Sequence, residues 1–222
     1  MKYVIANFKS NKTSQEVQTW LQSYLVQATS DVQVIVALPT PYLHLGHNST
    51  LLVGAQDVSP FPQGSYTGAT NASQLADMGV KFCLVGHSER RLYFHETKEE
   101  IANKVQELLK VGITPIVCVG QDDIAPQLST LTDQDIAHCL FAFETMSDIG
   151  GTHTSPIDQI KEATSLLERY TNNQSLGILY GGSVNAENVP TLPSLVDGVL
   201  VATASLEVAS FAKVVTGFVQ NA

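Results

Sequence analysis

Several polar residues stand directly after short apolar runs, at points where a buried strand would end. Lys9 follows the apolar residues near the N-terminus, with Asn7 two positions before it, while His87 and Glu144 each follow a later apolar run. A fixed lysine can bind an anion and stabilise a developing oxyanion, and a histidine and a carboxylate can move protons. The structural alternatives, a surface lysine, a hydrogen-bonded histidine and a paired acid, remain open on spacing alone.

The residues that follow these side chains indicate what they could do. A helix that begins at Ser88 would favour the neutral imidazole of His87, which can donate a hydrogen bond to a carbonyl. The small and polar residues at 145–152, directly after Glu144, are typical of a mobile segment that closes over a site. Residues 181–183 (Gly-Gly-Ser) follow another apolar run and could offer amides and a hydroxyl to a phosphate, or form an ordinary tight turn.

Eight apolar runs alternate with segments of helical periodicity. The runs are continuous, as expected for parallel strands that are buried on both faces. Capping boxes at Thr13 and Thr97, a Ser155–Pro156 start and helix stops at Gly79 and Gly112 mark the helices between them. We also expect Asn185 to cap a seventh helix and residues 206–219 to form an eighth. The expected strands are 3–8, 32–38, 51–56, 81–86, 114–119, 138–143, 176–180 and 198–201.

Eight strand–helix units without a linker predict a (β/α)8 barrel, a TIM barrel, as a single domain over residues 1–222. In such a barrel the chemistry lies at the carboxyl ends of the strands. The alternative is an open, doubly wound sheet. That fold usually carries a glycine-rich turn after its first strand, whereas residues 7–11 are Asn-Phe-Lys-Ser-Asn.

The composition of the chain argues against several classes of binding partner. The 222 residues carry a formal net charge of −9, which argues against sequence-independent binding to nucleic acid or to an anionic membrane. No apolar run approaches the length that spans a bilayer. The three cysteines form no CxxC pair and lie in apolar runs, so we expect a reducing, cytoplasmic location. The histidines lack a ligand spacing and no G-x-S-x-G turn occurs, so neither a metal site nor a serine triad is predicted.

Four motifs, in chain order, resemble those of the triosephosphate isomerases, and the resemblance covers almost the whole chain. They are Asn-Phe-Lys-Ser-Asn at 7–11, Ser-Tyr-Thr-Gly at 65–68, Val-Gly-His-Ser-Glu-Arg-Arg at 85–91 and Tyr-Gly-Gly-Ser-Val-Asn at 180–185. The third and fourth motifs are highly specific. The resemblance implies the interconversion of dihydroxyacetone phosphate and D-glyceraldehyde 3-phosphate, with no cofactor.

The same resemblance implies a role for each matching residue. Glu144 would be the base and neutral His87 the group that polarises the carbonyl, a pairing for which this family is itself the reference case. Lys9, oriented by Asn7, would supply positive charge to the enediolate. Ser88 and Glu89 would support these groups. The substrate and its phosphate are implied to bind at Asn7, Lys9, Gly150, Ser183, Ala202 and Thr203.

A second copy of the chain is implied by the loop at 57–69. This loop carries Phe61 and Tyr66 at positions that a monomer would leave exposed to water. By resemblance it plugs a pocket beside the neighbour's Lys9 and His87 and places Thr67 near that site. We expect a homodimer, and a larger assembly is left open.

The chain also departs from the family pattern. Thr-Met-Ser at 145–147 replaces the Pro and Trp that follow the family's glutamate, and Ala202 and Thr203 replace two glycines of the final loop. Acidic residues of the family are replaced at Ala69 and Gln121. The stretch 120–144 is short, which predicts a compressed fifth βα unit.

These departures leave two further functions open. The altered phosphate end could admit a four-carbon ketose phosphate. A barrel that has lost catalysis and serves in binding or assembly is the other alternative, although the retained Asn7, Lys9, His87 and Glu144 argue against it.

Overall fold

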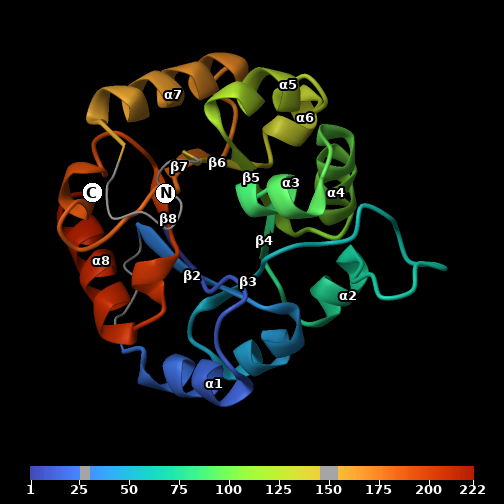
Figure 1. Ribbon diagram of the computed structural model, residues 1–222, viewed down its shortest axis with the longest axis horizontal. Coiled ribbons are helices and arrows are strands. Elements are labelled where there is room, and N and C mark those ends of the chain that lie inside the picture. Colours follow the sequence, from blue (N-terminus) through green and yellow to red (C-terminus); the bar gives the residue numbers. More distant parts are fainter. Residues whose placement is uncertain (26–30, 146–154) are drawn as a thin grey trace.

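The computed structural model describes residues 1–25, 31–145 and 155–222. Its strands are all parallel and pair in chain order, and β1 also pairs with β8, so the sheet closes into a barrel (Figure 1). Helices surround the strands, and the predicted (β/α)8 barrel is confirmed. The strands are β1 (Lys2–Asn7), β2 (Val32–Leu38), β3 (Leu52–Ala55), β4 (Phe82–Val85), β5 (Thr114–Val119), β6 (Leu140–Phe143), β7 (Gly177–Tyr180) and β8 (Gly198–Val201).

Two apolar clusters make up the core. Successive side chains of a strand point to opposite faces of the sheet. One set, which includes Ile5, Leu84 and Cys118, fills the interior of the barrel, while the other, which includes Val4 and Val36, packs outward against the helices. Both faces of the strands are therefore buried, which explains why their sequences are continuous apolar runs.

The helices begin and end largely where the sequence indicates. Thr13 and Thr97 form the expected capping boxes, and Gly79 and Gly112 end helices with φ values of 75° and 74°. The α-helices are α1 (Ser14–Ser23), α2 (Ala72–Asp77), α3 (Ser88–Phe94), α4 (Lys98–Lys110), α5 (Ile124–Leu128), α6 (Asp133–Ile136), α7 (Ile157–Tyr170) and α8 (Val208–Gln220). Short 3-10 segments are η1 (Thr40–Asn48), η2 (Gln121–Asp123), η4 (Val189–Thr191) and η5 (Thr203–Ser205).

Three local predictions need correction. Asn185 caps a turn and not the helix expected after β7. Its Oδ1 accepts from the amides of Glu187 and Asn188. The chain then forms only η4, because prolines at 190 and 193 oppose a longer helix. Helix α7 has Pro156, not Ser155, as its N-cap. Strand β6 begins at residue 140 instead of 138, because residues 138 and 139 close the last turn of α6.

The compressed fifth unit is confirmed. Between β5 and β6 the chain forms η2 and two short helices, α5 and α6, of five and four residues. Thr132 forms a capping box with Asp135 and so starts α6 as a separate helix. No long helix covers this side of the barrel within the part of the chain that the structure describes.

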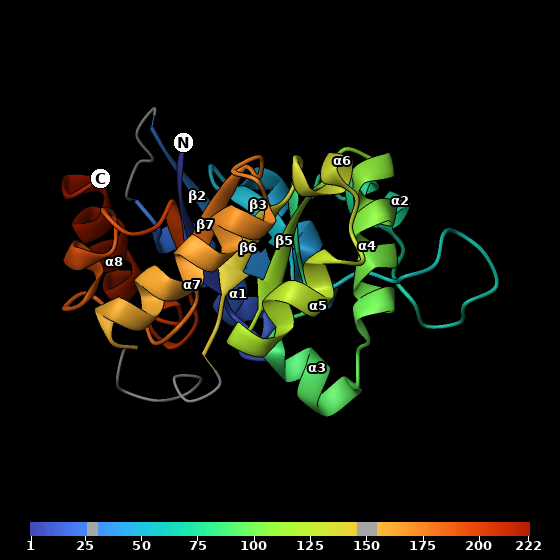
Figure 2. The same cartoon turned by 90° about the horizontal axis from the view of Figure 1, so that it is seen from above.

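A long loop joins β3 to α2 and projects from the body of the barrel (Figure 2). Phe61 and Tyr66 stack in this loop with ring centroids 4.5 Å apart, and both side chains are exposed in the single chain, as predicted. Among the described helices, none has the length and apolar character needed to cross a membrane.

Candidate active site

The carboxyl ends of five strands surround one cavity of about 580 Å³. Asn7 and Lys9 come from β1, His87 from the residues after β4, and Glu144 from the residue after β6. The ends of β7 and β8 add the other walls. The barrel therefore brings together the four residues that the sequence singled out for the chemistry. The remaining lining residues are Gly181, Ser183, Val184, Asn185, Ala186, Glu187, Leu200, Ala202, Thr203, Ala204, Ser210 and Lys213.

His87 is the N-cap of α3, and its hydrogen bonds define its tautomer. The amide of Glu89 donates to Nδ1 at 3.2 Å, so Nδ1 carries a lone pair and the proton of the neutral ring lies on Nε2. Nε2 is 3.1 Å from Oε1 of Glu144. Helix α3 has only seven residues, and this local bond selects the tautomer of the neutral ring that can donate through Nε2.

Glu144 is held against the first turn of α3. Its side chain is only 2% exposed, its Oε1 lies against the His87 ring, and its Oε2 accepts from the Ser88 amide at 3.0 Å. Gly181 packs closely against this side chain: a Cβ there would lie 3.1 Å from Cγ of Glu144. The carboxylate is thus buried beside the cavity, with one oxygen bonded to the Ser88 amide and the other 3.1 Å from the His87 ring.

Lys9 adopts a strained backbone conformation, with φ of 50°. Left-handed conformations in residues other than glycine cost about 1–3 kcal/mol and persist where the surroundings impose them. Oδ1 of Asn7 accepts from the Lys9 amide at 3.0 Å, and Nζ of Lys9 donates to Oε1 of Glu89 at 2.8 Å. Asn7 therefore orients the Lys9 backbone, and Glu89 orients its ammonium group.

The predicted phosphate residues line the part of the cavity at the carboxyl ends of β7 and β8. Ser183, with φ of 42°, follows β7, and Ala202 precedes η5, which begins at Thr203. Gly150, which the resemblance also assigns to this end, lies outside the described residues. The structure thus brings Ser183, Ala202 and Thr203 to the cavity that Glu144 and His87 share.

Two sets of lining and supporting residues escaped the sequence interpretation. Ser210 and Lys213 reach the cavity from α8, and their i, i+3 spacing could have placed them on one face of that helix. Arg91 ties α3 to the barrel through Gly86 O at 2.8 Å and Cys118 O at 3.0 Å. Its partner at 118 is distant in sequence, so no local signal could have revealed that contact.

A second, smaller cavity of about 220 Å³ lies beside Lys9, His87 and Glu89. It is also lined by Asp57 and Phe94, so it opens toward the base of the long loop after β3. This is the place where the resemblance expects the loop of a neighbouring copy.

Known proteins of one family are similar to this chain over nearly its whole length. The sequence model of the family described as "Triosephosphate isomerase" matches residues 2–218. A triosephosphate isomerase of Neisseria meningitidis is 35% identical, with 100% of this chain and 98% of the relative covered. Triosephosphate isomerases of Mesomycoplasma hyorhinis (35% identical, 96% and 97% covered) and of Synechocystis sp. (34% identical, 96% and 98% covered) are similar over the same extent. On a match that runs almost from end to end of a closed parallel barrel, the chain belongs to the triosephosphate isomerase family.

Proposed function

We propose that this cavity interconverts dihydroxyacetone phosphate and D-glyceraldehyde 3-phosphate through an enediolate, with Glu144 as base and neutral His87 as electrophile. Family membership makes the chain an isomerase of a phosphorylated triose. One observation supports the residue roles above all others. The Glu89 amide occupies Nδ1 of His87, while Nε2 points at the carboxylate of Glu144.

The proposed steps use only these side chains. Glu144 takes a proton from C1 of the ketose, and His87 donates its Nε2 proton to the oxygen on C2. His87 then takes the proton of the C1 hydroxyl, and Glu144 returns its proton to C2. The aldose forms and both residues recover their starting protonation. The ammonium of Lys9 stabilises the negative charge on the enediolate.

The two contacts of Glu144 imply an exchange on substrate binding. The substrate carbonyl would lie against Nε2 of His87, where Oε1 of Glu144 now lies, and would accept its proton. The carboxylate would also leave the Ser88 amide and face C1. A base that is buried and prebonded in this way has little water to displace at the moment of reaction.

The phosphate would bind between Ser183 and the turn at Ala202 and Thr203, with Gly150 as a further predicted contact. Ser183 offers a hydroxyl, and the start of η5 offers backbone amides. The side chains of Ala202 and Thr203 leave their amides available, so the substitution of two glycines changes the shape of the cradle more than its donors.

A coupled assay of both directions tests the base. Glu144→Gln keeps the size of the side chain and removes the base, so kcat should fall by about 10²–10⁴-fold. Glu187→Gln is the matched control, because Glu187 is an exposed acid on the same cavity. The assignment is wrong if Glu144→Gln keeps the activity of Glu187→Gln.

One observation favours a broader substrate range. Ser210 and Lys213 of α8 also line the cavity, so it holds a hydroxyl and a cation besides the residues proposed for the phosphate. A four-carbon ketose phosphate is therefore a second candidate substrate. The ratio of kcat/KM values for the three- and four-carbon substrates decides between them. A substrate-analogue titration that leaves the thermal stability unchanged would instead favour a barrel without catalysis.

We further propose a homodimer in which the loop of one copy, with Tyr66 and Thr67, enters the smaller cavity beside Lys9 and His87 of the other. The exposed Phe61–Tyr66 stack and the projection of the loop support this arrangement (Figure 2). Sedimentation analysis should show a dimer. A monomer with full activity would contradict it.

A cytoplasmic location is proposed on the support of the three cysteines. Cys83, Cys118 and Cys139 are buried and free, as is usual in a reducing compartment. Fluorescence microscopy of a tagged chain in its host tests this location.

A further inference from the structure

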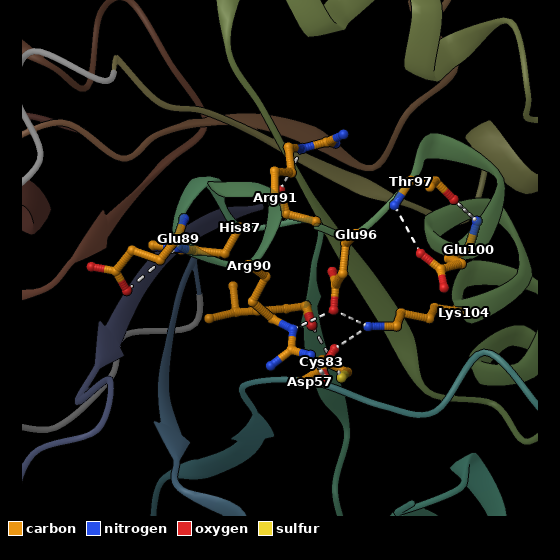
Figure 3. A network of polar contacts seen from close by, with 12 residues as sticks. Asp57, Cys83, His87, Glu89, Arg90, Arg91, Glu96, Thr97, Glu100 and Lys104 are labelled. Atoms are coloured by element: carbon orange, nitrogen blue, oxygen red, sulfur yellow. Dashed lines mark hydrogen bonds and ion pairs between the residues drawn. The ribbon is translucent and has the colours of Figure 1, made fainter. Parts of the chain in front are cut away.

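Four charged side chains form a buried ion cluster beside the candidate site (Figure 3). Asp57 follows β3, Arg90 lies in α3, Glu96 precedes α4 and Lys104 lies in α4. Nη2 of Arg90 is 2.9 Å from Oδ2 of Asp57, and Nζ of Lys104 donates to Oδ1 of Asp57 at 2.6 Å. Both cations also bond to Oε1 of Glu96. The cluster therefore joins the long loop, α3 and α4.

The charges of the cluster balance, but they are poorly hydrated. The side chains of Lys104 and Glu96 are 3% and 6% exposed, and those of Asp57 and Arg90 about a quarter. Burial raises the pKa of Asp57 above its usual value, and this effect outweighs the attraction of Lys104 and Arg90. Among the four, Asp57 is thus a group that can gain a proton while the protein stays folded.

Arg90 connects the cluster to the first turn of α3. Its amide donates to the His87 carbonyl at 2.8 Å, and its guanidinium lies over the ring of Phe94, 4.6 Å from the centroid. The three residues before Arg90 make the contacts of the candidate site: His87 with Glu144, the Ser88 amide with Glu144, and Glu89 with Lys9. The position of this turn therefore depends on what holds Arg90.

Asp57 also faces the site across the smaller cavity, whose walls it shares with Lys9, His87 and Glu89. Burial raises the pKa of the Cys83 thiol on β4, and the negative charge of Asp57 raises it further. Among the described residues, the charged and titratable groups that interact with Asp57 or line the cavities beside it are Arg90, Lys104, Glu96, Glu100, Tyr66, Lys9, His87, Glu89 and Cys83.

We infer that Asp57 is a positioning residue for the isomerisation: its negative charge holds Arg90, and with it the turn that carries His87, Ser88 and Glu89, and a proton on Asp57 loosens that turn. The inference rests on the roles proposed above for His87 and Glu144. The alternative is that Asp57 only cross-links the loop to α4. In that case it would support folding, and the geometry of the site would not depend on the charge of Asp57.

The test compares Asp57→Asn, which mimics the protonated side chain, with Asp123→Asn. Asp123 is the matched control because it lies near an arginine of the same helix, at 3.9 Å from Nε of Arg91, but is 44% exposed. At neutral pH, Asp57→Asn should lower kcat by about three- to tenfold with a smaller change in KM, since small displacements of catalytic groups reduce the rate. The control should keep wild-type values.

The pH dependence gives a readout that a structural role alone would not move. As the pH falls, kcat of the wild type should decline toward that of Asp57→Asn, and the variant should lack this step. Equal kcat values and equal pH profiles for the wild type and Asp57→Asn would overturn the inference.

An NMR titration of the wild type tests the same link without a variant and without turnover. The carboxyl carbon of Asp57 and the ring nitrogens of His87 should shift with a common midpoint. If the His87 ring signals do not shift at the pH where Asp57 titrates, the coupling is refuted, even if Asp57→Asn does not fold. Coupled signals in a protein without isomerase activity would instead refute the proposed function and leave the coupling intact.

Discussion

Replacing Lys104 by methionine would remove one cation of the buried ion cluster while keeping the length of the side chain. The Lys104 side chain is 3% exposed, and its Nζ bonds to Asp57 and Glu96. Without it, two carboxylates share only Arg90, which leaves one negative charge unbalanced in a poorly hydrated site. Breaking a buried ion pair by removing one partner costs about 3–5 kcal/mol. We expect the free energy of unfolding to fall by that amount, a large part of the stability of a typical domain.

Urea denaturation at neutral pH and one protein concentration measures this loss. Lys110→Met is the matched control: Lys110 lies in the same helix and pairs with Glu107, but its side chain is 64% exposed. Exposed pairs contribute about 0–1 kcal/mol, so the control should stay close to the wild type. Equal stabilities of the two variants would refute the view that burial makes the cluster sensitive to the loss of one charge.

Three other changes test separate features. Burial raises the pKa of Asp57 above its ordinary value of 3.8, so the native state binds this proton more tightly than the unfolded chain does. The contribution of Asp57 to the free energy of unfolding therefore falls as the pH rises. In urea denaturation, the stability of Asp57→Asn relative to the wild type should increase from acidic to neutral pH. A difference that does not vary with pH would contradict this. Burial raises the pKa of Tyr24 to about 12, and none of the described residues hydrogen-bonds its hydroxyl. Tyr24→Phe should therefore preserve stability or raise it by up to about 1 kcal/mol, and a clear loss in thermal melting would show that the hydroxyl has a partner. Gly181→Ala would bring a methyl group to 3.1 Å from Cγ of Glu144, so kcat should fall about tenfold or more with little change in Tm; wild-type kcat would show that this contact does not position the base.

Much of the candidate site could be predicted because a parallel barrel places all its strand ends at one rim. Asn7, Lys9, His87 and Glu144 follow apolar runs, and the closed sheet brings them to one cavity. A helix start at Ser88 predicted a neutral His87 but did not predict its tautomer. It depends on the direction of one amide, that of Glu89, and therefore on the detailed turn at the start of α3.

The buried ion cluster could not be predicted, since its members look like ordinary solvated charges in the sequence. Lys104 lies in α4 among several other charged residues, and only the packing of α3 and the long loop against this helix removes it from water. The absence of a helix after β7, where only η4 forms, could have been predicted from the sequence. Pro190 and Pro193 follow Asn185 closely, and these two helix breakers oppose the helix that a cap residue alone would start.

The proton transfer itself is the most direct test of the proposed chemistry. Dihydroxyacetone phosphate is incubated with the protein in heavy water, and the hydrogen at C2 of the trapped aldose is followed by NMR. We predict deuterium at C2 with the wild type and with Glu187→Gln, because the proton on Glu144 exchanges with solvent before it is returned. With Glu144→Gln, labelled product should form at least about 10²-fold more slowly. Labelling at the same rate in Glu144→Gln and Glu187→Gln would contradict the assignment of Glu144 as the base.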